Sequence, residues 1–378
     1  MINHFTFHSV GQGLFYTGCL NHGDYTFVYD CGSTSKTHLQ GEINKFVKHH
    51  KDIDFVVLSH MHDDHIIGIT DLCQRCNVKK LYLPYLGADN EVIALILANE
   101  LLTGNSSPAS LEAFYTMSYL YGVTDVAENG QRLWRTEVEF WGNGDEKDPK
   151  IDRKGFIYSS HNFTYLDNER KPYWEFKMLN RAMGVGILHQ LSAKLRSLLN
   201  NHASVLNQSV SILDLVKMGS IDVIKQIYHQ VFASVNINLT STLLIHYPTD
   251  INAQSSIKCC KFCCMRHCRL CKRLRCYCTT TVLTGDVSFN DQLSNEVNKV
   301  LSTLPHCVLQ IPHHGSLPNW KSIDTTLLNH SDVFVISHGH NHKYHPNGSA
   351  LLQMQGYLCR NNIRSVTQFQ DYKYVIWS

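Results

Sequence analysis

Alternating apolar and polar residues at the start of the chain predict a β-meander. The alternation runs through residues 5–10, 14–17 and 25–30, and Gly11-Gln12-Gly13 marks the first turn. Residues 39–49 then carry apolar side chains at helical spacing. The run 54–58 is apolar and rich in β-branched residues, as in a buried strand. The opening of the chain therefore combines strands with one amphipathic helix.

The middle of the chain changes to a helical pattern, and the last third returns to alternating strands and helices. Apolar spacing predicts helices over 91–102, 110–121, 186–199, 220–233, 291–301 and 350–361. Strands are predicted at 81–84, 173–179, 236–247, 279–286, 308–311, 333–336 and 366–377. This order predicts an α/β fold interrupted by a largely helical insertion.

The segment directly after the 54–58 strand carries the strongest chemical signal. Ser59-His60-Met61-His62-Asp63-Asp64-His65 contains three imidazoles and two carboxylates. Burying such groups unpaired is costly, whereas divalent metals favour imidazole nitrogen and carboxylate oxygen as ligands. In extended backbone His60 and His62 point the same way, so Asp64 and His65 can reach a second ion. A solvated, His-rich loop is the less favoured alternative.

Three later segments place similar residue types directly after predicted strands. Thr284-Gly285-Asp286 ends one strand with a carboxylate, for which turn chemistry is the alternative. Pro312-His313-His314-Gly315-Ser316 follows the next strand. The segment 336–346 holds four further histidines, and its last, His345, precedes a proline. Each segment therefore supplies candidate metal ligands.

These segments, in this order, resemble the metal-binding signatures of the metallo-β-lactamase superfamily. The first has the spacing His-x-His-x-Asp-His, and Asp286 occupies the position of the family's bridging carboxylate. Val10-Gly11-Gln12-Gly13, the strand end Asp30-Cys31-Gly32 and the Pro-His-His-Gly-Ser segment look most like the hydrolase domain attached to bacterial competence channels, the ComEC-like branch.

The resemblance implies a four-layer αββα sandwich with every motif on loops at one edge of the two sheets. It divides the chain into a hydrolase core of 1–86 and 236–378 and a mostly helical insertion of 87–235 over the active-site face. It also implies two divalent ions, Zn²⁺ or Mn²⁺, with the ligands His60, His62, Asp64, His65, Asp286, His313 and His345. Asp64 and Asp286 are the expected catalytic residues, which hold and orient a metal-activated hydroxide.

Two points of the ligand set stay open. In the Pro-His-His segment we favour His313 as the ligand, with His314 as the alternative. Many superfamily members also carry a histidine between the first motif and the bridging aspartate, and none stands out here by its context. The first ion is therefore expected to depend on the Pro-His-His segment or to be held weakly.

A cysteine-rich segment interrupts the predicted core hairpin at residues 258–278. Its two Cys-x-x-Cys pairs suit tetrahedral zinc, and seven Lys and Arg residues accompany them. We expect a structural Zn²⁺ bound by Cys260, Cys263, Cys268 and Cys271. An unligated loop and disulfide bonds are the alternatives. A basic zinc knuckle beside a hydrolytic cleft suits a polyanionic substrate.

Composition limits the remaining possibilities. The 34 Lys and Arg nearly balance the 32 Asp and Glu, so no global field draws the protein to nucleic acid or membrane. No apolar run reaches the roughly 18 residues that span a bilayer, and the amino terminus lacks the pattern of a signal peptide. We therefore expect a cytoplasmic protein with reduced thiols, Cys73 and Cys76 included, and no membrane partner.

These features predict a metal-dependent hydrolase acting on phosphodiesters, with DNA or RNA as the favoured substrate. One alternative is a hydrolase of a small ester, thioester or nucleotide. Another is a subunit of a multiprotein assembly, such as an anti-phage defence system, whose helical insertion docks a protein partner.

Overall fold

The computed structural model describes most of the chain. The described residues are 1–84, 88–103, 107–124, 136–141, 150–151, 157–159, 163–180, 185–206, 209–233, 241–250, 252–257, 278–340, 342–358 and 362–378. The four cysteines predicted to bind zinc lie outside these ranges, so that prediction stays open.

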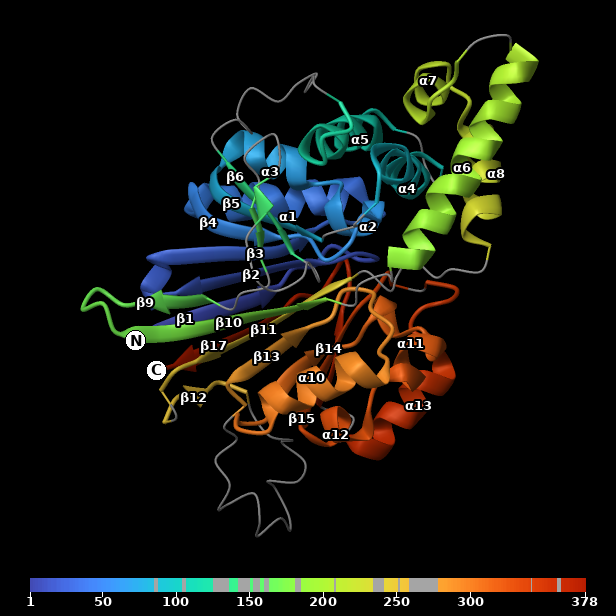
Figure 1. Cartoon of the computed structure of the whole chain (residues 1–378). Coiled ribbons are helices and arrows are strands. Elements are labelled where there is room, and N and C mark those ends of the chain that lie inside the picture. The colour runs from blue at the N-terminus through green and yellow to red at the C-terminus, as the bar shows by residue number, and fades with distance from the viewer. Residues whose placement is uncertain are drawn as a thin grey trace.

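Two sheets form the centre of the molecule (Figure 1). In spatial order, the described strands of the larger sheet are β12 (Gln254–Ser255), β17 (Tyr372–Trp377), β1 (Ile2–Phe7), β2 (Phe15–Leu20), β3 (Tyr25–Cys31), β4 (Asp52–Val57), β5 (Asn77–Pro84), β6 (Glu137–Trp141), β8 (Ile157–Ser159) and β7 (Lys150–Ile151). Those of the smaller sheet are β16 (Ile363–Val366), β15 (Ser331–Ser337), β14 (Cys307–Gln310), β13 (Thr280–Leu283), β11 (Thr242–Pro248), β10 (Pro172–Asn180) and β9 (Phe163–Leu166).

Helices cover the outer face of each sheet, which confirms the predicted αββα sandwich (Figure 1). On the side of the larger sheet lie α1 (Lys36–His49), α2 (Asp63–Ile66), α3 (Ile69–Arg75), α4 (Asn90–Leu102), α5 (Pro108–Leu120), α6 (Val185–Leu206), α7 (Ile212–Lys217) and α8 (Ile221–Phe232). On the side of the smaller sheet lie α10 (Asp291–Leu301), α11 (Leu317–Ser322), α12 (Thr325–Asn329) and α13 (Gly348–Tyr357). Short 3₁₀ turns are η1 (Asn21–Gly23) and η4 (His313–Gly315).

The range 87–235 is only partly an insertion. It contains the helices α4 to α8, as predicted, but it also supplies strands to both sheets. β6 pairs in parallel with β5, and β10 pairs with β11 from Trp174–Pro248 to Asn180–Thr242. The pattern at 173–179 predicted a strand, and the structure shows that this strand is part of the core. The sheets therefore extend beyond the predicted core boundaries.

Aromatic side chains fill the space between the two sheets. Phe5, Phe27 and Phe176 are almost completely buried there. His246 of β11 lies among these rings, where its Nδ1 accepts a hydrogen bond from Trp174 Nε1 at 3.3 Å and its Nε2 lies 2.8 Å from the Tyr16 hydroxyl. A buried histidine with both ring nitrogens satisfied is stable only as the neutral imidazole.

The buried His246 is expected to make stability depend on pH. Burial lowers the pKa of His246 from 6.5 to about 3. The unfolded chain therefore takes up this proton below about pH 6.5, while the folded chain does not, so stability falls as the pH falls toward 3. The loss should be about 1.4 kcal/mol per pH unit. Urea unfolding between pH 4.5 and 6 measures how the free energy of unfolding depends on pH. For His246→Gln this dependence should be smaller than for the wild type by the same amount per pH unit, and His189→Gln, at an exposed position, is the control.

Two further observations bear on predictions from composition. The described cysteines are all free, and Cys73 and Cys76 are buried in the core under α1 and α3. No helix in the described part of the chain is both long and apolar enough to cross a membrane.

Candidate metal centre

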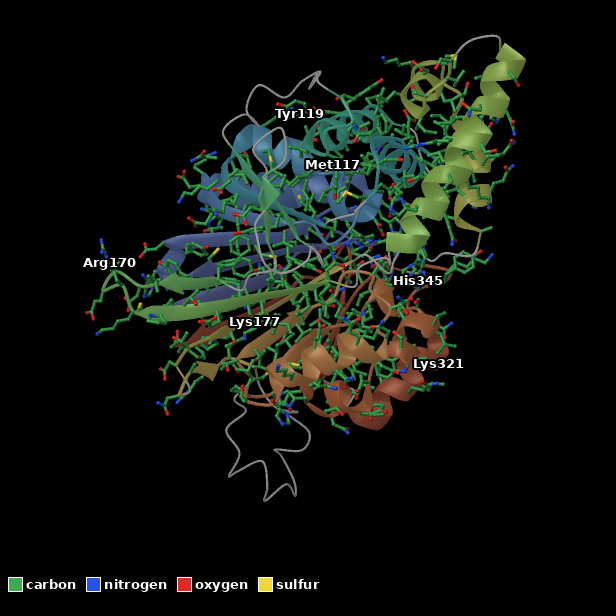
Figure 2. All side chains as sticks on the ribbon, in the orientation of Figure 1. Met117, Tyr119, Arg170, Lys177, Lys321 and His345 are labelled. Atoms are coloured by element: carbon green, nitrogen blue, oxygen red, sulfur yellow. The ribbon has the colours of Figure 1, made fainter. Side chains whose placement is uncertain are left out.

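The predicted motifs meet where parallel strands of both sheets end. β3, β4 and β5 run parallel in the larger sheet, and β13, β14 and β15 run parallel in the smaller one. Their carboxyl ends face each other at one end of the sandwich. Two hydrogen bonds join the sheets there: Thr242 N donates to Ser59 O at 2.8 Å, and the Tyr29 hydroxyl donates to Thr242 O at 2.7 Å. Figure 2 places His345 at this end, far from Arg170 in the β9–β10 turn.

A first group of potential metal ligands consists of His60, His62 and Asp286. His60 Nε2 lies 2.9 Å from His62 Nδ1 and 3.5 Å from Asp286 Oδ2. His62 Nδ1 lies 3.8 Å from the same carboxylate oxygen. Three ligand atoms thus converge on one point, and His60 and Asp286 are buried.

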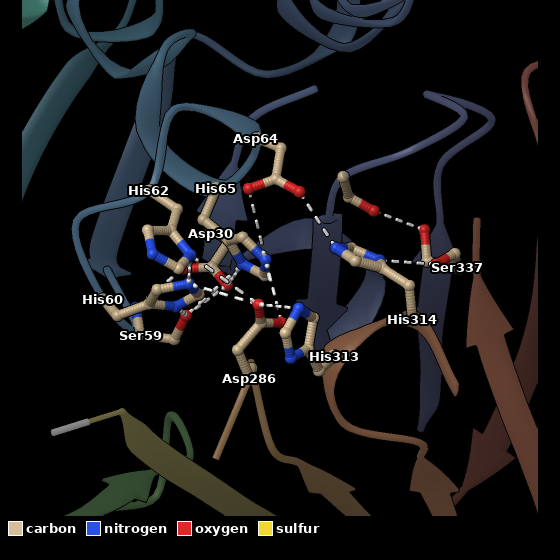
Figure 3. A network of polar contacts seen from close by, with 12 residues as sticks. Asp30, Ser59, His60, His62, Asp64, His65, Asp286, His313, His314 and Ser337 are labelled. Atoms are coloured by element: carbon tan, nitrogen blue, oxygen red, sulfur yellow. Dashed lines mark hydrogen bonds and ion pairs between the residues drawn. The ribbon is translucent and has the colours of Figure 1, made fainter. Parts of the chain in front are cut away.

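A second group lies beside the first and consists of Asp64, His65 and His314. His314 Nε2 is 3.0 Å from Asp64 Oδ2, and His65 Nε2 is 3.9 Å from Asp64 Oδ1. His65 Nε2 is also 3.2 Å from Asp286 Oδ1. Asp286 therefore directs one oxygen to each group, as Figure 3 shows.

Hydrogen bonds behind the histidines fix which nitrogen faces the centre (Figure 3). Asp30 Oδ2 accepts from His65 Nδ1 at 2.7 Å, and the Ser337 carbonyl accepts from His314 Nδ1 at 2.7 Å. These partners only accept, so each Nδ1 carries the proton and each Nε2 presents a lone pair. Ser59 Oγ donates to Asp30 and lies 2.9 Å from His60 Nδ1, which orients that ring in the same way.

The electrostatics of the centre suit divalent cations. Burial raises the pKa of Asp286, but the facing imidazoles hold it well below its ordinary value of 3.8. Burial lowers the pKa of His65, but the surrounding carboxylates raise it well above 6.5. Burial and the neighbouring His65 lower the pKa of His60 to about 3, so this imidazole stays neutral. The carboxylates therefore stay ionised and favour positive charge at His65, and a divalent cation would supply such charge at the same place.

Two buried atoms test whether metal ions fit the centre. Asp286 Oδ1 and His65 Nε2 are buried and lie 3.2 Å apart, and neither has a hydrogen-bond partner within the described part of the chain. An unsatisfied buried polar atom is costly, and both atoms belong to residues of the two groups. A divalent cation with nitrogen and oxygen ligands would satisfy both, so the residues fit the implied ions.

One family model matches the part of the chain that holds the first motif. The family model described as the metallo-beta-lactamase superfamily matches residues 16–90, which include the His60–His65 motif and the strands that position it. The matched segment is similar to that superfamily, and it spans less than half of the chain. Among solved structures, the "Crystal Structure of a New Diphosphatase from the PhnP Family" covers 100% of both chains at 10% identity and a TM-score of 0.38. The Rm3 metallo-beta-lactamase covers 27% of this chain and 37% of its own, at 18% identity and a TM-score of 0.16. No curated protein matches this chain.

Both histidines of the Pro-His-His segment face the candidate metal centre. His314 belongs to the second group. His313 donates from Nδ1 to Asn319 Oδ1 at 3.2 Å, and its Nε2 lies 3.8 Å from Asp286 Oδ2, the oxygen that faces His60 and His62. The geometry therefore favours His314 for the second ion and places His313 beside the first group.

His345, the other predicted ligand of the second ion, lies outside both groups. Its ring centroid is 5.3 Å from that of His313 and 6.3 Å from that of His314. Its Nδ1 is buried without a hydrogen-bond partner. Burial and the neighbouring histidines lower the pKa of His345 to about 4. The geometry therefore places this imidazole beside the two groups, and its role as a metal ligand stays a prediction.

Sequence reasoning missed the residues that support the ligands. Asp30, Ser59 and Ser337 were visible only as strand ends, and Glu100 of α4 was visible only as part of a helix. Glu100 Oε2 lies 2.5 Å from His62 Nε2 although 38 positions of sequence separate them. The available signal for Glu100 was an acidic side chain on a helix whose other residues are mostly apolar.

Glycines let the loops approach the His60–His65 motif closely. Gly13 has φ +146°, and a Cβ there would lie 2.5 Å from Gly32 O and 2.6 Å from Asp64 O. Leu14 N donates to Asp64 O at 3.1 Å, so the 10–13 loop holds the backbone of the motif. The 10–13 loop therefore lies beside the His60–His65 motif, and its place at the edge of a metal cleft stays a prediction.

Gly13→Ala is expected to destabilise the protein by about 2–3 kcal/mol, because the new Cβ collides with backbone. Gly41→Ala is the matched control, since Gly41 lies in α1 and a Cβ there meets nothing within 4 Å. That control should raise stability by about 0.5–1 kcal/mol through helix propensity. Urea unfolding measures both, and equal effects would contradict the packing argument.

Proposed function

We propose that this protein is a metal-dependent phosphodiesterase, with nucleic acid as the favoured substrate. The observation that carries the proposal is the pair of adjacent His and carboxylate groups that share Asp286. The similarity of residues 16–90 to the metallo-β-lactamase superfamily supports a metal-dependent hydrolase in general terms, and the choice of phosphodiester is our own. Two bound divalent ions would lower the pKa of a water molecule toward neutrality and polarise a phosphoryl oxygen.

Each residue of the centre has a separate role in this proposal. His60, His62 and Asp286 would hold the first ion, and Asp64, His65, His314 and Asp286 the second. The carboxylates of Asp64 and Asp286 face the space between the groups and orient the attacking water there. His345 offers a neutral N–H to a non-bridging phosphoryl oxygen.

Two features favour a polyanionic substrate. The Pro-His-His-Gly-Ser segment resembles the competence-channel branch, and the cysteine-rich segment carries seven Lys and Arg residues. We further propose that Cys260, Cys263, Cys268 and Cys271 bind a structural zinc ion. Deletion of 258–278 should then lower the zinc content by one ion per chain.

A substrate panel tests the proposal. Purified protein with Mn²⁺ or Zn²⁺ should hydrolyse bis(p-nitrophenyl) phosphate and single- or double-stranded nucleic acid faster than p-nitrophenyl acetate or a thioester. Asp64→Ala should remove this activity, whereas Asp71→Ala on α3, whose side chain pairs with Arg75, should retain it. Hydrolysis of the ester or thioester alone would reject the phosphodiesterase proposal in favour of a small-ester hydrolase.

A further inference from the structure

Glu100 connects the helices outside the sandwich to the first group of ligands. Its carboxylate uses both oxygens: Oε2 lies 2.5 Å from His62 Nε2, and Oε1 accepts from the Tyr228 hydroxyl at 2.7 Å and from Asn99 Nδ2 at 3.1 Å. The Glu100 side chain is 8% exposed. Tyr228 belongs to α8, and Figure 1 shows α4 beside α6 and α8.

This contact determines how His62 faces the centre. An ionised carboxylate only accepts hydrogen bonds, so His62 Nε2 carries the proton and Nδ1 presents its lone pair. That Nδ1 is the atom 2.9 Å from His60 Nε2 and 3.8 Å from Asp286 Oδ2. A carboxylate behind a metal-bound histidine orients the ring and raises its basicity as a ligand.

The second group uses different supports. His65 is oriented by Asp30 of β3, and His314 by the carbonyl of Ser337 of β15. Both supports belong to the sheets, whereas the support of His62 belongs to a helix of the 87–235 range. The two groups are therefore separable by substitution.

We propose that Glu100 is a positioning residue for the first metal ion and that Tyr228 holds Glu100 in place. The helices α4 and α8 thereby set the affinity of one site and leave the other unaffected. This inference rests on the proposed function for the presence of the ions, and it assigns to the helical layer a role inside the metal centre.

Metal binding tests the inference without an activity assay. Metal-free protein is titrated with Mn²⁺ by calorimetry, and with Co²⁺ by its visible absorption, for the wild type, Glu100→Ala, Glu100→Gln and Tyr228→Phe. Matched controls are Glu112→Gln on α5, which accepts from Gln74, and Tyr121→Phe, whose hydroxyl donates to Pro84 O. Circular dichroism reports whether each variant folds.

Glu100→Ala should weaken the first ion by about 10- to 100-fold and leave the second ion at wild-type affinity. Glu100→Gln keeps the size of the side chain and accepts a hydrogen bond more weakly than a carboxylate. Its loss of affinity for the first ion should therefore be smaller than that of Glu100→Ala, and Tyr228→Phe should lose less affinity than either. Two ions bound at wild-type affinity by a folded Glu100→Ala or Glu100→Gln would overturn the inference and leave the proposed function standing. A wild-type protein that binds no ion would overturn both.

Discussion

Asp286→Asn is expected to lower the rate of hydrolysis by about a thousandfold or more. Asp286 directs Oδ2 to His60 at 3.5 Å and Oδ1 to His65 at 3.2 Å, so its two oxygens serve both groups. An amide has one oxygen and no charge, and it cannot bridge two cations. Loss of the several kcal/mol that bound metal ions supply corresponds to a factor of this size.

The same variant should lose the stabilisation that metal ions give to the folded protein. A ligand at 100 times its Kd stabilises by about 2.7 kcal/mol, so Mn²⁺ should raise the Tm of the wild type and leave that of Asp286→Asn nearly unchanged. Steady-state rates and thermal scans with and without Mn²⁺ measure the two effects. Asp291→Asn, an exposed residue in the first turn of α10, is the control. Metal-dependent activity retained by Asp286→Asn would reject the bridging role.

His314→Ala is expected to remove the second ion and to lower hydrolysis by about a hundredfold or more, because His314 Nε2 and Asp64 Oδ2 converge at 3.0 Å. His345→Ala should still bind two ions, since His345 lies outside both groups, and it should raise KM if His345 contacts the substrate. Comparing these two variants shows whether His314 or His345 is the ligand of the second ion.

Metal content and Mn²⁺ titration of the two variants give the decisive result. Loss of the second ion from His345→Ala, together with its retention in His314→Ala, would favour the ligand set that the sequence alone predicted. His313 faces the first group. Any loss of metal affinity in His313→Ala should therefore concern the first ion and not the second.

The sequence predicted those parts of the site that are local in the chain. The His60–His65 motif follows a strand whose apolar run is unmistakable, and Asp286 follows a second strand. Both lie at one edge of the two sheets, where the predicted αββα sandwich places them. Helix α10 begins and ends where its apolar spacing predicted, Asp291–Leu301.

The remaining features depend on contacts between distant parts of the chain. His313 and His314 are chemically identical neighbours, and a turn with φ of +49° and +53° decides which ring reaches Asp64. Glu100 contacts His62 only because α4 packs beside the motif. The pairing of β5 with β6 joins segments that the 87–235 boundary had separated. Spacing in one sequence contains no information on such contacts.

The central claim is that two ions share Asp286, and anomalous X-ray diffraction at the metal edge tests it most directly. Crystals grown with Mn²⁺ or Zn²⁺ should show two peaks about 3.5–4 Å apart. One peak should contact His60, His62 and Asp286, and the other Asp64, His65, His314 and Asp286. A single peak, or two peaks that do not share Asp286, would contradict the account.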